Sequence, residues 1–221
     1  SVLPVKKFED YLMMATRKGI VKKIELGQFN NPRKGGIKAI RVVETDDTLI
    51  GVKPMRDGQE VLLVTKNGQA IRFKGSDVRS MGRASYGVSG IKLAKGDHVV
   101  SLEVLPIEDS DEYSIITITE RGYGKRSKIN DYRLTGRSGK GVINMKVTSK
   151  TGEIVNSCSI TGKDNIIVMT ENGIVIRTPV KNIRVMGRAT QGVKIINLKS
   201  SDKVSDFAKV PTEKDVSEGA D

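Results

Sequence analysis

The sequence predicts an all-β protein that resembles a propeller, with about four four-stranded blades. Three observations predict this fold: an internal repeat of about fifty residues, two glycines at fixed places in every repeat, and the lack of sustained helical periodicity in the body of the chain. A four-stranded sheet repeated at this spacing is typical of a propeller-like blade, which buries its faces against its neighbours.

Each repeat opens with a predicted β-hairpin. The four hairpin segments are residues 12–19, 61–68, 115–122 and 166–173, and they end in Gly19, Gly68, Gly122 and Gly173, which are 49, 54 and 51 residues apart. Their β-branched residues favour a pleated, half-buried surface, and glycine supplies the positive φ of a tight turn. The hairpins therefore set the period of the fold.

A second glycine follows in each repeat, at Gly36, Gly87, Gly141 and Gly192, and introduces a further apolar strand. About four strands per repeat are therefore expected. We place the end of a preceding truncated blade at residues 1–10, blades at 11–59, 60–110, 111–163 and 164–211, and an acidic tail at 212–221, all within one domain.

The overall charge indicates a polyanionic partner. The chain of 221 residues holds 38 lysines and arginines against 26 acidic residues, for a net charge of +12, and 37% hydrophobic residues suffice for a core. Duplex nucleic acid is the first expectation and an anionic membrane the second. No apolar stretch approaches the roughly 20 residues of a membrane span, and the single Cys158 fits a reducing cytoplasm.

Cations recur in step with the repeat. Lys23, Arg72, Arg126 and Arg177 each stand four residues after a hairpin glycine. The pattern R-x-x-G-R-[AS]-x-x-G-V occupies 79–88, 133–142 and 184–193, and the shorter first repeat offers Arg33-Lys34-Gly35-Gly36 instead. Five residues after the second glycine stand Arg41, Lys92 and Lys146, and Asn197 breaks this series.

These recurring cations predict a surface for the phosphates of DNA, because glycine lets a backbone approach a phosphate that a cation neutralises. A curved track of such loops around the rim would bend a duplex. The predicted DNA-binding residues are Lys22, Lys23, Arg33, Lys34, Arg41, Arg72, Lys74, Arg79, Arg83, Lys92, Lys125, Arg126, Arg133, Arg137, Lys140, Lys146, Arg177, Arg184 and Arg188.

Structural roles explain parts of the same pattern. Basic residues also line the solvated edges of β proteins, where lysine discourages aggregation between sheets. The glycines also serve turn chemistry, and Met81 and Met186 are expected to pack into the core. These interpretations remain open beside the DNA interpretation.

Catalytic chemistry is weak in this sequence. Gly141 follows Gly139-Lys140 where a phosphate-binding P-loop needs serine or threonine, and one histidine with one cysteine builds neither a zinc site nor a histidine-based triad. Tyr123 and Tyr132 stand beside cations but lack a cluster of metal-binding carboxylates. We therefore expect a chain that is no enzyme by itself and holds no cofactor or metal.

Several separated motifs resemble one family. The tandem hairpins, the string Gly122-Tyr123-Gly124-Lys125-Arg126, the run 139–147 and the Arg-x-Met-Gly-Arg loops are similar to the C-terminal domain of the A subunit of bacterial DNA gyrase, a type IIA DNA topoisomerase, over residues 2–210. The resemblance implies about four blades of a six-bladed β-pinwheel, in which neighbouring blades exchange strands and a basic rim wraps duplex DNA in a positive sense.

The resemblance also implies a setting for the chain. Wrapping would support ATP-dependent negative supercoiling, with ATP, magnesium and the strand-breaking tyrosine belonging to other domains. The implied partners are duplex DNA, the rest of the gyrase A subunit, and the gyrase B subunit in an A2B2 complex, in a cytoplasmic, nucleoid-associated setting without membrane. The isolated chain is expected to be a monomer.

The sequence departs from the family in one motif. The family's heptapeptide Q-R-R-G-G-K-G is matched by 135–141 only at Arg137, Gly139, Lys140 and Gly141. The true heptapeptide is therefore expected upstream, and four blades are expected to form an open arc rather than a closed ring. The alternatives are the related C-terminal domain of topoisomerase IV and a protein-interaction propeller, although 4% aromatic residues and no tryptophan argue against the latter.

Overall fold

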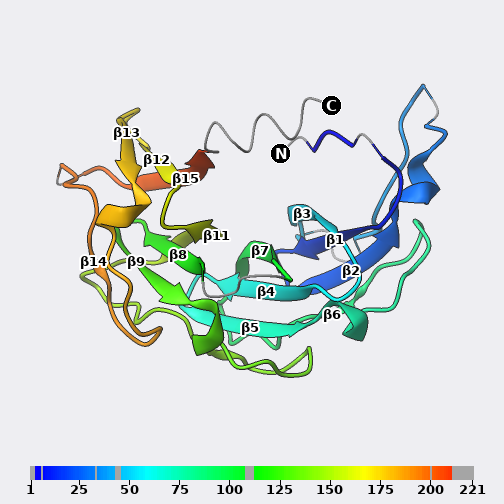
Figure 1. The fold of residues 1–221 in the computed structure, drawn as a ribbon, viewed down its shortest axis with the longest axis horizontal. Helices are drawn as coiled ribbons and strands as arrows, with labels where there is room; N and C mark the ends of the chain where they lie inside the picture. The colour runs from blue at the N-terminus through cyan, green and yellow to red at the C-terminus, as the bar shows by residue number, and fades with distance from the viewer. Residues whose placement is uncertain are drawn as a thin grey trace. The chain divides into compact units, whose positions relative to one another are not determined.

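The computed structural model describes residues 3–5, 7–32, 34–42, 46–107, 112–199 and 201–210. Within these ranges the regular structure consists of β-strands and four short 3-10 turns (Figure 1). The chain divides into two compact units. Unit 1 comprises 1–65, 69–107 and 133–142, and unit 2 comprises 66–68, 108–132 and 143–221.

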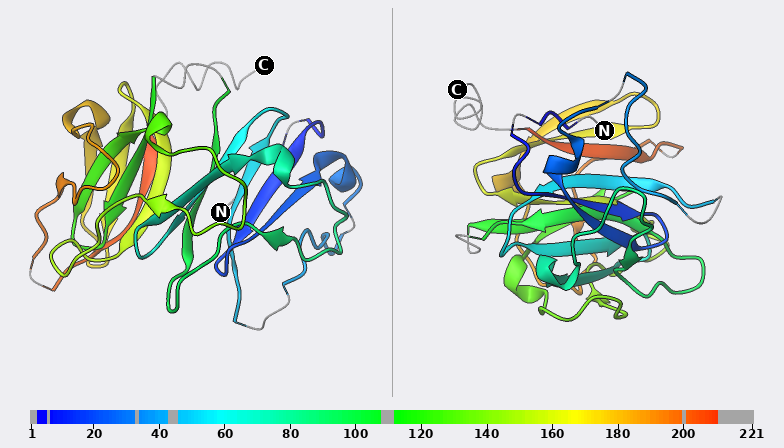
Figure 2. Two further views of the ribbon diagram at one scale, coloured as in Figure 1. Left: turned by 90° about the horizontal axis from the view of Figure 1, so that it is seen from below. Right: turned by 90° about the vertical axis from the view of Figure 1, so that its right-hand side faces the viewer.

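Unit 1 carries two antiparallel sheets. The first has the order β3-β1-β2-β6, with β1 at Tyr11–Thr16, β2 at Ile20–Glu25, β3 at Leu49–Met55 and β6 at Val88–Ser89. The second has the order β10-β5-β4-β7, with β4 at Glu60–Thr65, β5 at Gln69–Lys74, β7 at Val99–Leu105 and β10 at Val142–Ile143. The strands β1, β2 and β3 lie side by side in the ribbon views (Figure 1, Figure 2).

Unit 2 also carries two sheets. The third has the order β11-β8-β9-β14, with β8 at Tyr113–Thr119, β9 at Tyr123–Lys128, β11 at Ile154–Thr161 and β14 at Val193–Lys194. The fourth has the order β13-β12-β15, with β12 at Asn165–Thr170, β13 at Val175–Pro179 and β15 at Val204–Val210.

The predicted hairpins are confirmed in all four repeats. They are the pairs β1/β2, β4/β5, β8/β9 and β12/β13, each antiparallel. The turn glycines Gly19, Gly68, Gly122 and Gly173 have φ of +81°, +93°, +77° and +82°. This left-handed conformation is costly for residues with a Cβ, which explains the glycine at each turn.

The first hairpin strands β1, β4 and β8 are buried on both faces and are apolar runs, whereas residues of β12 alternate between buried and partly exposed. In unit 1, Met13, Val61 and Leu63 join Phe73 in one core cluster, and in unit 2, Ile116, Ile166 and Phe207 belong to another. Burial of whole hydrophobic side chains stabilises each by about 1.5–3 kcal/mol. The cores fix where the hairpins stand, and with them the loops that follow.

The fourth strand of each complete sheet comes from the next repeat. Strands β6, β10 and β14 each follow a second glycine, and they join the sheets of the first, second and third hairpins. The prediction of four-stranded blades is therefore correct for three sheets. The fourth sheet has three strands within the described residues, because no further repeat there supplies a strand. The strand exchange implied by the family resemblance is present.

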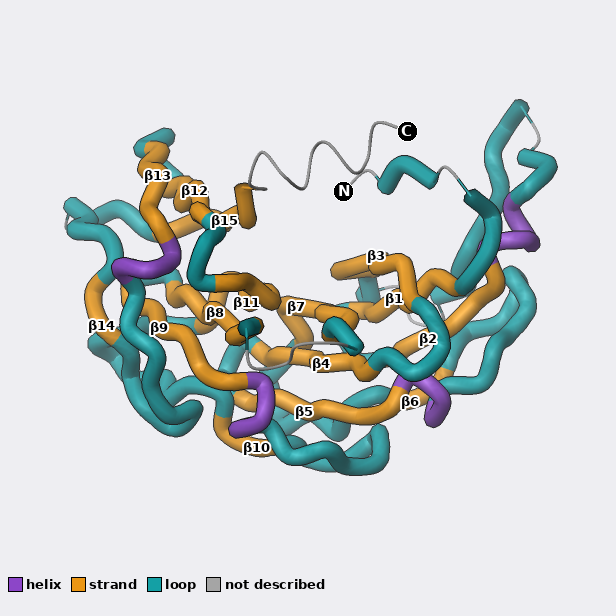
Figure 3. The backbone as a smooth tube through the Cα atoms, in the orientation of Figure 1, coloured by secondary structure: helices purple, strands orange, loops and turns teal. Residues whose placement is uncertain are grey.

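A 3-10 turn ends each hairpin and directs the chain into a loop. These turns are η1 at Leu26–Phe29, η2 at Gly75–Asp77, η3 at Ile129–Asp131 and η4 at Val180–Asn182, shown in purple in Figure 3. Across the described part of the chain, no helix has the length and apolar character needed to cross a membrane. The predicted blade boundaries remain predictions, and the acidic tail at 212–221 lies outside the described residues.

Candidate nucleic-acid interface

Three loops carry the repeated arginine pattern, and we call 79–87, 133–141 and 184–192 the arginine loops. Each is fastened to the second hairpin strand of the preceding repeat through one equivalent hydrogen bond. The backbone N–H groups of Met81, Thr135 and Met186 donate to the carbonyl oxygens of Lys23, Arg72 and Arg126, at 2.9, 2.9 and 2.8 Å. The cation four residues after a hairpin glycine therefore marks the attachment point of the next loop.

The side chains at these attachment points are engaged within the protein. Lys23 is buried, with its ammonium 4.7 Å from the centre of the Tyr11 ring. Arg72 is half-buried and its Nε donates to Glu60 Oε2 at 2.5 Å. Arg126 is half-buried and its Nε donates to the carbonyl oxygen of Ile183 at 2.7 Å.

Arg177, the fourth member of that series, is exposed. Within the described residues no loop is attached beside it, which separates it from its three equivalents. Sequence spacing placed all four in one class, although the structure divides them into three packed cations and one solvated cation.

Two predicted DNA-binding lysines lie inside the protein. Lys22 and Lys125 are both 0% exposed, and each ammonium donates to oxygen atoms of the protein. A buried charge cannot meet a phosphate without displacing those bonds, so both residues leave the candidate surface. Their position on strands that are buried on both faces is the physical reason for this correction.

Most exposed members of the predicted set lie on the arginine loops or on segments beside them, and Arg177 on β13 lies apart from these loops. Arg33 lies outside the described residues. The exposed predicted cations are Lys34, Arg41, Lys74, Arg79, Arg83, Lys92, Arg133, Lys140, Lys146, Arg177 and Arg184.

The series five residues after the second glycine adds a cation beside each loop. The backbone N–H groups of Arg41, Lys92 and Lys146 donate to the carbonyl oxygens of Ser85, Gly139 and Thr190, at 3.3, 2.9 and 3.0 Å. These oxygens stand at the same place in the three loops, two residues before the second glycine. Each arginine loop therefore receives an exposed cation from the preceding repeat.

The second arginine of the motif links one loop to the segment before it. Arg137 is half-buried, and its Nε and Nη1 donate to the carbonyl oxygens of Asp77 at 3.1 Å and Ser89 at 3.0 Å. Arg188 is also half-buried and its Nη1 donates to the carbonyl oxygen of Ile143 at 2.9 Å. Arg83, the third equivalent, is exposed.

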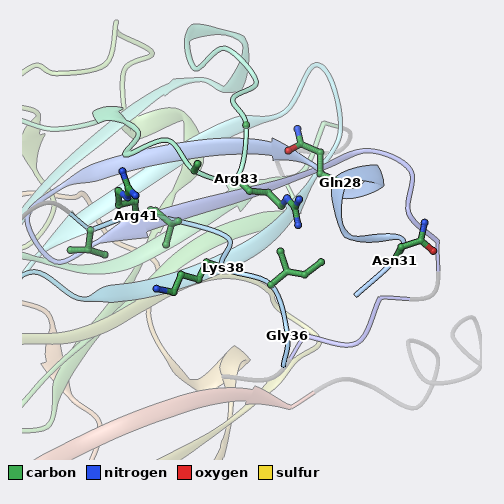
Figure 4. Close-up of a pocket in the computed structure, with 11 residues that line it drawn as sticks. Gln28, Asn31, Gly36, Lys38, Arg41 and Arg83 are labelled. Carbon is green, nitrogen blue, oxygen red and sulfur yellow. The ribbon is translucent and has the colours of Figure 1, made fainter. Parts of the chain in front are cut away.

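A basic hollow lies beside the first arginine loop. It is lined by Gly36 and the side chains of Gln28, Lys38, Arg41 and Arg83, among others (Figure 4). The guanidinium of Arg41 lies 5.5 Å from the centre of the Tyr86 ring and donates to its hydroxyl at 3.3 Å, which holds that arginine in place. Three cations and the glycine-bearing backbone make this hollow suitable for an anion.

The two glycines of each arginine loop occupy different surroundings. A Cβ at Gly87, Gly141 or Gly192 would stand 2.6 Å or less from a backbone oxygen, at φ between +76° and +97°. A Cβ at Gly82, Gly136 or Gly187 would meet nothing within 4 Å. The protein's own packing therefore requires the second glycine and leaves open space at the first.

The two tyrosines weighed as nucleophiles have structural contacts. Tyr132 is 1% exposed, its hydroxyl donates to Asn144 Oδ1, and burial raises the pKa of Tyr132. Thr117 and Ser157, whose hydroxyl oxygens are 2.7 Å apart, extend this network. Tyr123 is half-buried with the Lys150 ammonium 5.5 Å from its ring centre. Neither arrangement supplies the buried base or the metal-binding carboxylates that strand cleavage would use.

Comparison with known proteins places these loops in a known context. The family model described as DNA gyrase C-terminal domain, beta-propeller, matches residues 10–54, 59–106, 113–157 and 164–211. The chain is 44% identical over 209 residues to the DNA gyrase A subunit of Deinococcus deserti, covering 92% of the chain and 25% of that protein. It is 39% identical over 213 residues to the DNA gyrase A subunit of Chlamydia muridarum, covering 95% of the chain and 25% of the relative.

Two solved structures share the fold. The C-terminal domain of DNA topoisomerase IV matches with a TM-score of 0.88 and 26% identity, covering 99% of this chain and 70% of that one. A DNA gyrase A C-terminal domain matches with a TM-score of 0.82 and 24% identity, covering 93% of this chain and 68% of that one. The chain thus spans about a quarter of the length of the curated relatives that it matches.

Proposed function

Because the chain belongs to the family of DNA gyrase C-terminal domains, we propose that it is a non-catalytic module that binds, bends and wraps duplex DNA. The proposal treats the arginine loops as the contact surface. The phosphate backbone supplies most of the affinity of such a module, so exposed cations matter more than base-reading side chains.

One observation carries the proposal. Three equivalent loops combine exposed cations with a glycine at which an added Cβ would contact no other atom. Arg79, Arg133 and Arg184 begin the three loops and are exposed, and each loop is flanked by Arg41, Lys92 or Lys146. The open glycines leave the backbone accessible for close approach. A structural role alone explains the enclosed second glycines but gives no reason for the open ones.

Bending would follow from having two contact loops within one compact unit. In unit 1 the loop at 133–141 lies against the segment that follows the loop at 79–87, because Ser138 N–H donates to the Gly90 carbonyl oxygen at 2.7 Å. Smooth bending of a 20–30 base-pair site costs on the order of 1–6 kcal/mol. Contacts from several loops must therefore act together to hold a bent duplex.

The module is proposed to work within a larger topoisomerase. Since the chain matches a quarter of the DNA gyrase A subunit, we propose that it serves an ATP-dependent negative supercoiling reaction whose ATP site, magnesium and strand-breaking tyrosine lie elsewhere. The proposed partners are the rest of the gyrase A subunit, together with the gyrase B subunit, in an A2B2 complex. The proposed location is the nucleoid of a bacterial cytoplasm.

A second candidate is a module of the topoisomerase IV type. It is favoured by the TM-score of 0.88 to the C-terminal domain of DNA topoisomerase IV, while the sequence identities of 39–44% to DNA gyrase A subunits favour the first candidate. Sealing nicked circular DNA with ligase in the presence of the chain distinguishes the two candidates. Positive wrapping changes the linking number of the product, and binding without wrapping leaves it unchanged.

The primary test measures binding of the chain to fluorescent duplexes of increasing length across a salt series, with energy transfer between the duplex ends. Wrapping predicts that affinity rises with length, falls steeply with salt, and is accompanied by approach of the ends. Equal affinity for short and long duplexes with unchanged end-to-end distance would reduce the chain to an anchoring module. If the chain bound an acidic protein as tightly as duplex DNA, the proposed DNA-binding function would be wrong.

A further inference from the structure

Two buried lysines occupy one position in alternate repeats. Lys22 and Lys125 each stand three residues after a hairpin glycine, and Ile71 and Ile176 stand at the same place in the other two repeats. Isoleucine therefore satisfies the sheet at this position without a charge. A buried ammonium costs several kcal/mol of desolvation unless it is well paired, so the two lysines need a reason that strand packing does not supply.

Each ammonium is aimed at the arginine loop of the following repeat. Lys22 Nζ donates to the carbonyl oxygens of Ala39, Arg83 and Ser85, at 2.8, 2.7 and 3.1 Å. Two of these three oxygens belong to the loop at 79–87. The third belongs to the segment that follows Gly36, so one ammonium joins the basic segments of two repeats.

The second lysine repeats the arrangement in unit 2. Lys125 Nζ donates to the carbonyl oxygens of Gly187 at 3.1 Å and Arg188 at 2.6 Å, and to Ser127 Oγ at 2.8 Å. The hydroxyl of Ser127 itself donates to the carbonyl oxygen of Met186 at 2.9 Å. Because that hydroxyl has a single hydrogen, it can only accept from Lys125.

Both sites therefore match the protonated lysine. Each presents three acceptors, and an ammonium has three N–H donors whereas a neutral amine has two. In both loops the fixed backbone includes the second arginine of the motif, Arg83 or Arg188, directly after the open glycine. The ammonium thus holds the part of the loop that carries the candidate phosphate contacts.

The loop at 133–141 is held in another way. Its neighbour at the equivalent strand position is Ile71, whose Cδ1 lies 3.4 Å from the Cβ position of Gly139. Arg137 of this loop donates to two carbonyl oxygens of the protein. Where the strand supplies no ammonium, the arginine of the loop makes two hydrogen bonds to protein carbonyl oxygens, whereas in the two loops that a lysine holds Arg188 makes one and Arg83 is exposed.

From this contrast we propose, resting on the proposed DNA function, that Lys22 and Lys125 are positioning residues of the DNA-binding surface. They contact no phosphate. Each fixes the backbone of an arginine loop from the protein interior. The cations and the open glycine of that loop can then contact DNA without a further loss of conformational entropy in the loop. The loop at 133–141 does not depend on a lysine.

The positioning is sensitive to pH. Burial lowers the pKa of Lys125 to about 7, opposed by the nearby carboxylate of Asp131, while the Arg188 guanidinium lowers it further. Burial also lowers the pKa of Lys22. Below pH 7 the Lys125 ammonium is complete and the loop at 184–192 is held. As pH rises through this value, the amine keeps two hydrogens for three acceptors and one hydrogen bond is lost.

The test compares Lys125→Met with the matched control Ile71→Met, which changes the equivalent strand position beneath the loop at 133–141. Amide hydrogen exchange without DNA is the first readout. We expect exchange at 184–192 to rise about tenfold in Lys125→Met, as loss of charged hydrogen bonds implies. The same variant should bind duplex DNA about fivefold more weakly with an unchanged salt slope, because no phosphate contact is removed.

The pH series on the unmodified chain is the second readout and needs no variant. After correction for intrinsic exchange, the exchange of 184–192 relative to 133–141 should rise between pH 6 and 8.5, and this rise should vanish in Lys125→Met. A folded Lys125→Met chain with unaltered exchange at 184–192 would overturn the proposal. So would a constant ratio across the pH series in the unmodified chain.

The two proposals fail separately. If the unmodified chain does not bind duplex DNA, the proposed function fails, while the exchange measurements without DNA still decide whether the lysines hold the loops. If the unmodified chain binds DNA and both exchange measurements show no effect, the positioning role alone is wrong. Lys22→Met repeats the comparison on the loop at 79–87 and should raise its exchange in the same way.

Discussion

Each arginine loop contains two glycines, and the two positions require glycine for different reasons. At Gly87, Gly141 and Gly192 a Cβ would collide with a backbone oxygen of the preceding repeat, at a positive φ. At Gly82, Gly136 and Gly187 a Cβ would enter open space. The comparison separates what the fold demands of a loop from what an outside ligand demands of it.

The largest expected effect is on stability, at an enclosed glycine. Gly141→Ala places a Cβ against the Ala70 carbonyl oxygen at φ of +77°. Strained φ and steric overlap together should lower the free energy of unfolding by at least about 3 kcal/mol. Chemical denaturation measures this, with Gly136→Ala in the same loop as the control. Equal stability of the two variants would remove the distinction between the glycines.

The next effect is on DNA affinity, at the exposed arginines that begin the loops. The triple variant Arg79→Glu, Arg133→Glu, Arg184→Glu should bind duplex DNA at least about a hundredfold more weakly at moderate salt. Its slope of log K against log salt should fall by about 2.7, from roughly 0.9 for each phosphate contact. Titration by fluorescence anisotropy gives both quantities.

The control for that variant makes the same change of charge elsewhere. Lys95, Lys150 and Lys163 are exposed and lie outside the arginine loops. Lys95→Glu, Lys150→Glu, Lys163→Glu should leave most of the affinity in place. A control as damaged as the loop variant would mean that net charge, and not the loops, decides binding.

A smaller effect is expected at the open glycines, with stability and binding moving in opposite directions. The triple variant Gly82→Ala, Gly136→Ala, Gly187→Ala should gain about 0.4–1 kcal/mol of stability per site, because alanine reduces the entropy of the unfolded chain. Three added methyl groups on the contact surface should weaken duplex binding about fivefold. Higher stability with undiminished binding would show that DNA does not approach the backbone at these positions.

The smallest effect on duplex affinity is expected where a recurring cation is a packing residue. Arg72→Met breaks a half-buried ion pair with Glu60 and should cost about 1–3 kcal/mol of stability, with duplex affinity changed less than about twofold. Arg177→Met, at the equivalent exposed position, should leave stability unchanged and reduce affinity more than Arg72→Met does. A larger loss of duplex affinity in Arg72→Met than in Arg177→Met would indicate that the cations at the attachment points contact DNA.

The hairpins and the repeat could be predicted because their causes are local. Gly19, Gly68, Gly122 and Gly173 stand where a tight turn needs positive φ, and apolar β-branched residues precede most of them. The pairing of β6, β10 and β14 with the preceding repeat is not local. It was expected only from the family resemblance, since a two-residue strand is too short for its sequence to predict which strand it pairs with.

The site was harder to predict because repetition marks packing as well as binding. At Lys23, Arg72 and Arg126 a loop attaches through the backbone, and the side chains are engaged by Tyr11, Glu60 and the Ile183 carbonyl, which the sequence does not place beside them. One feature of the sequence could have predicted that Lys22 and Lys125 are buried. Their equivalents in the other repeats are Ile71 and Ile176, which indicates an interior position.

If the arginine loops hold duplex DNA, a saturating duplex long enough to reach several loops should slow their amide hydrogen exchange. We expect slowed exchange at 79–87, 133–141 and 184–192, and unchanged exchange along β3, β7, β11 and β15 at the opposite edges of the sheets. Protection of those edge strands with unprotected loops would contradict this role of the loops.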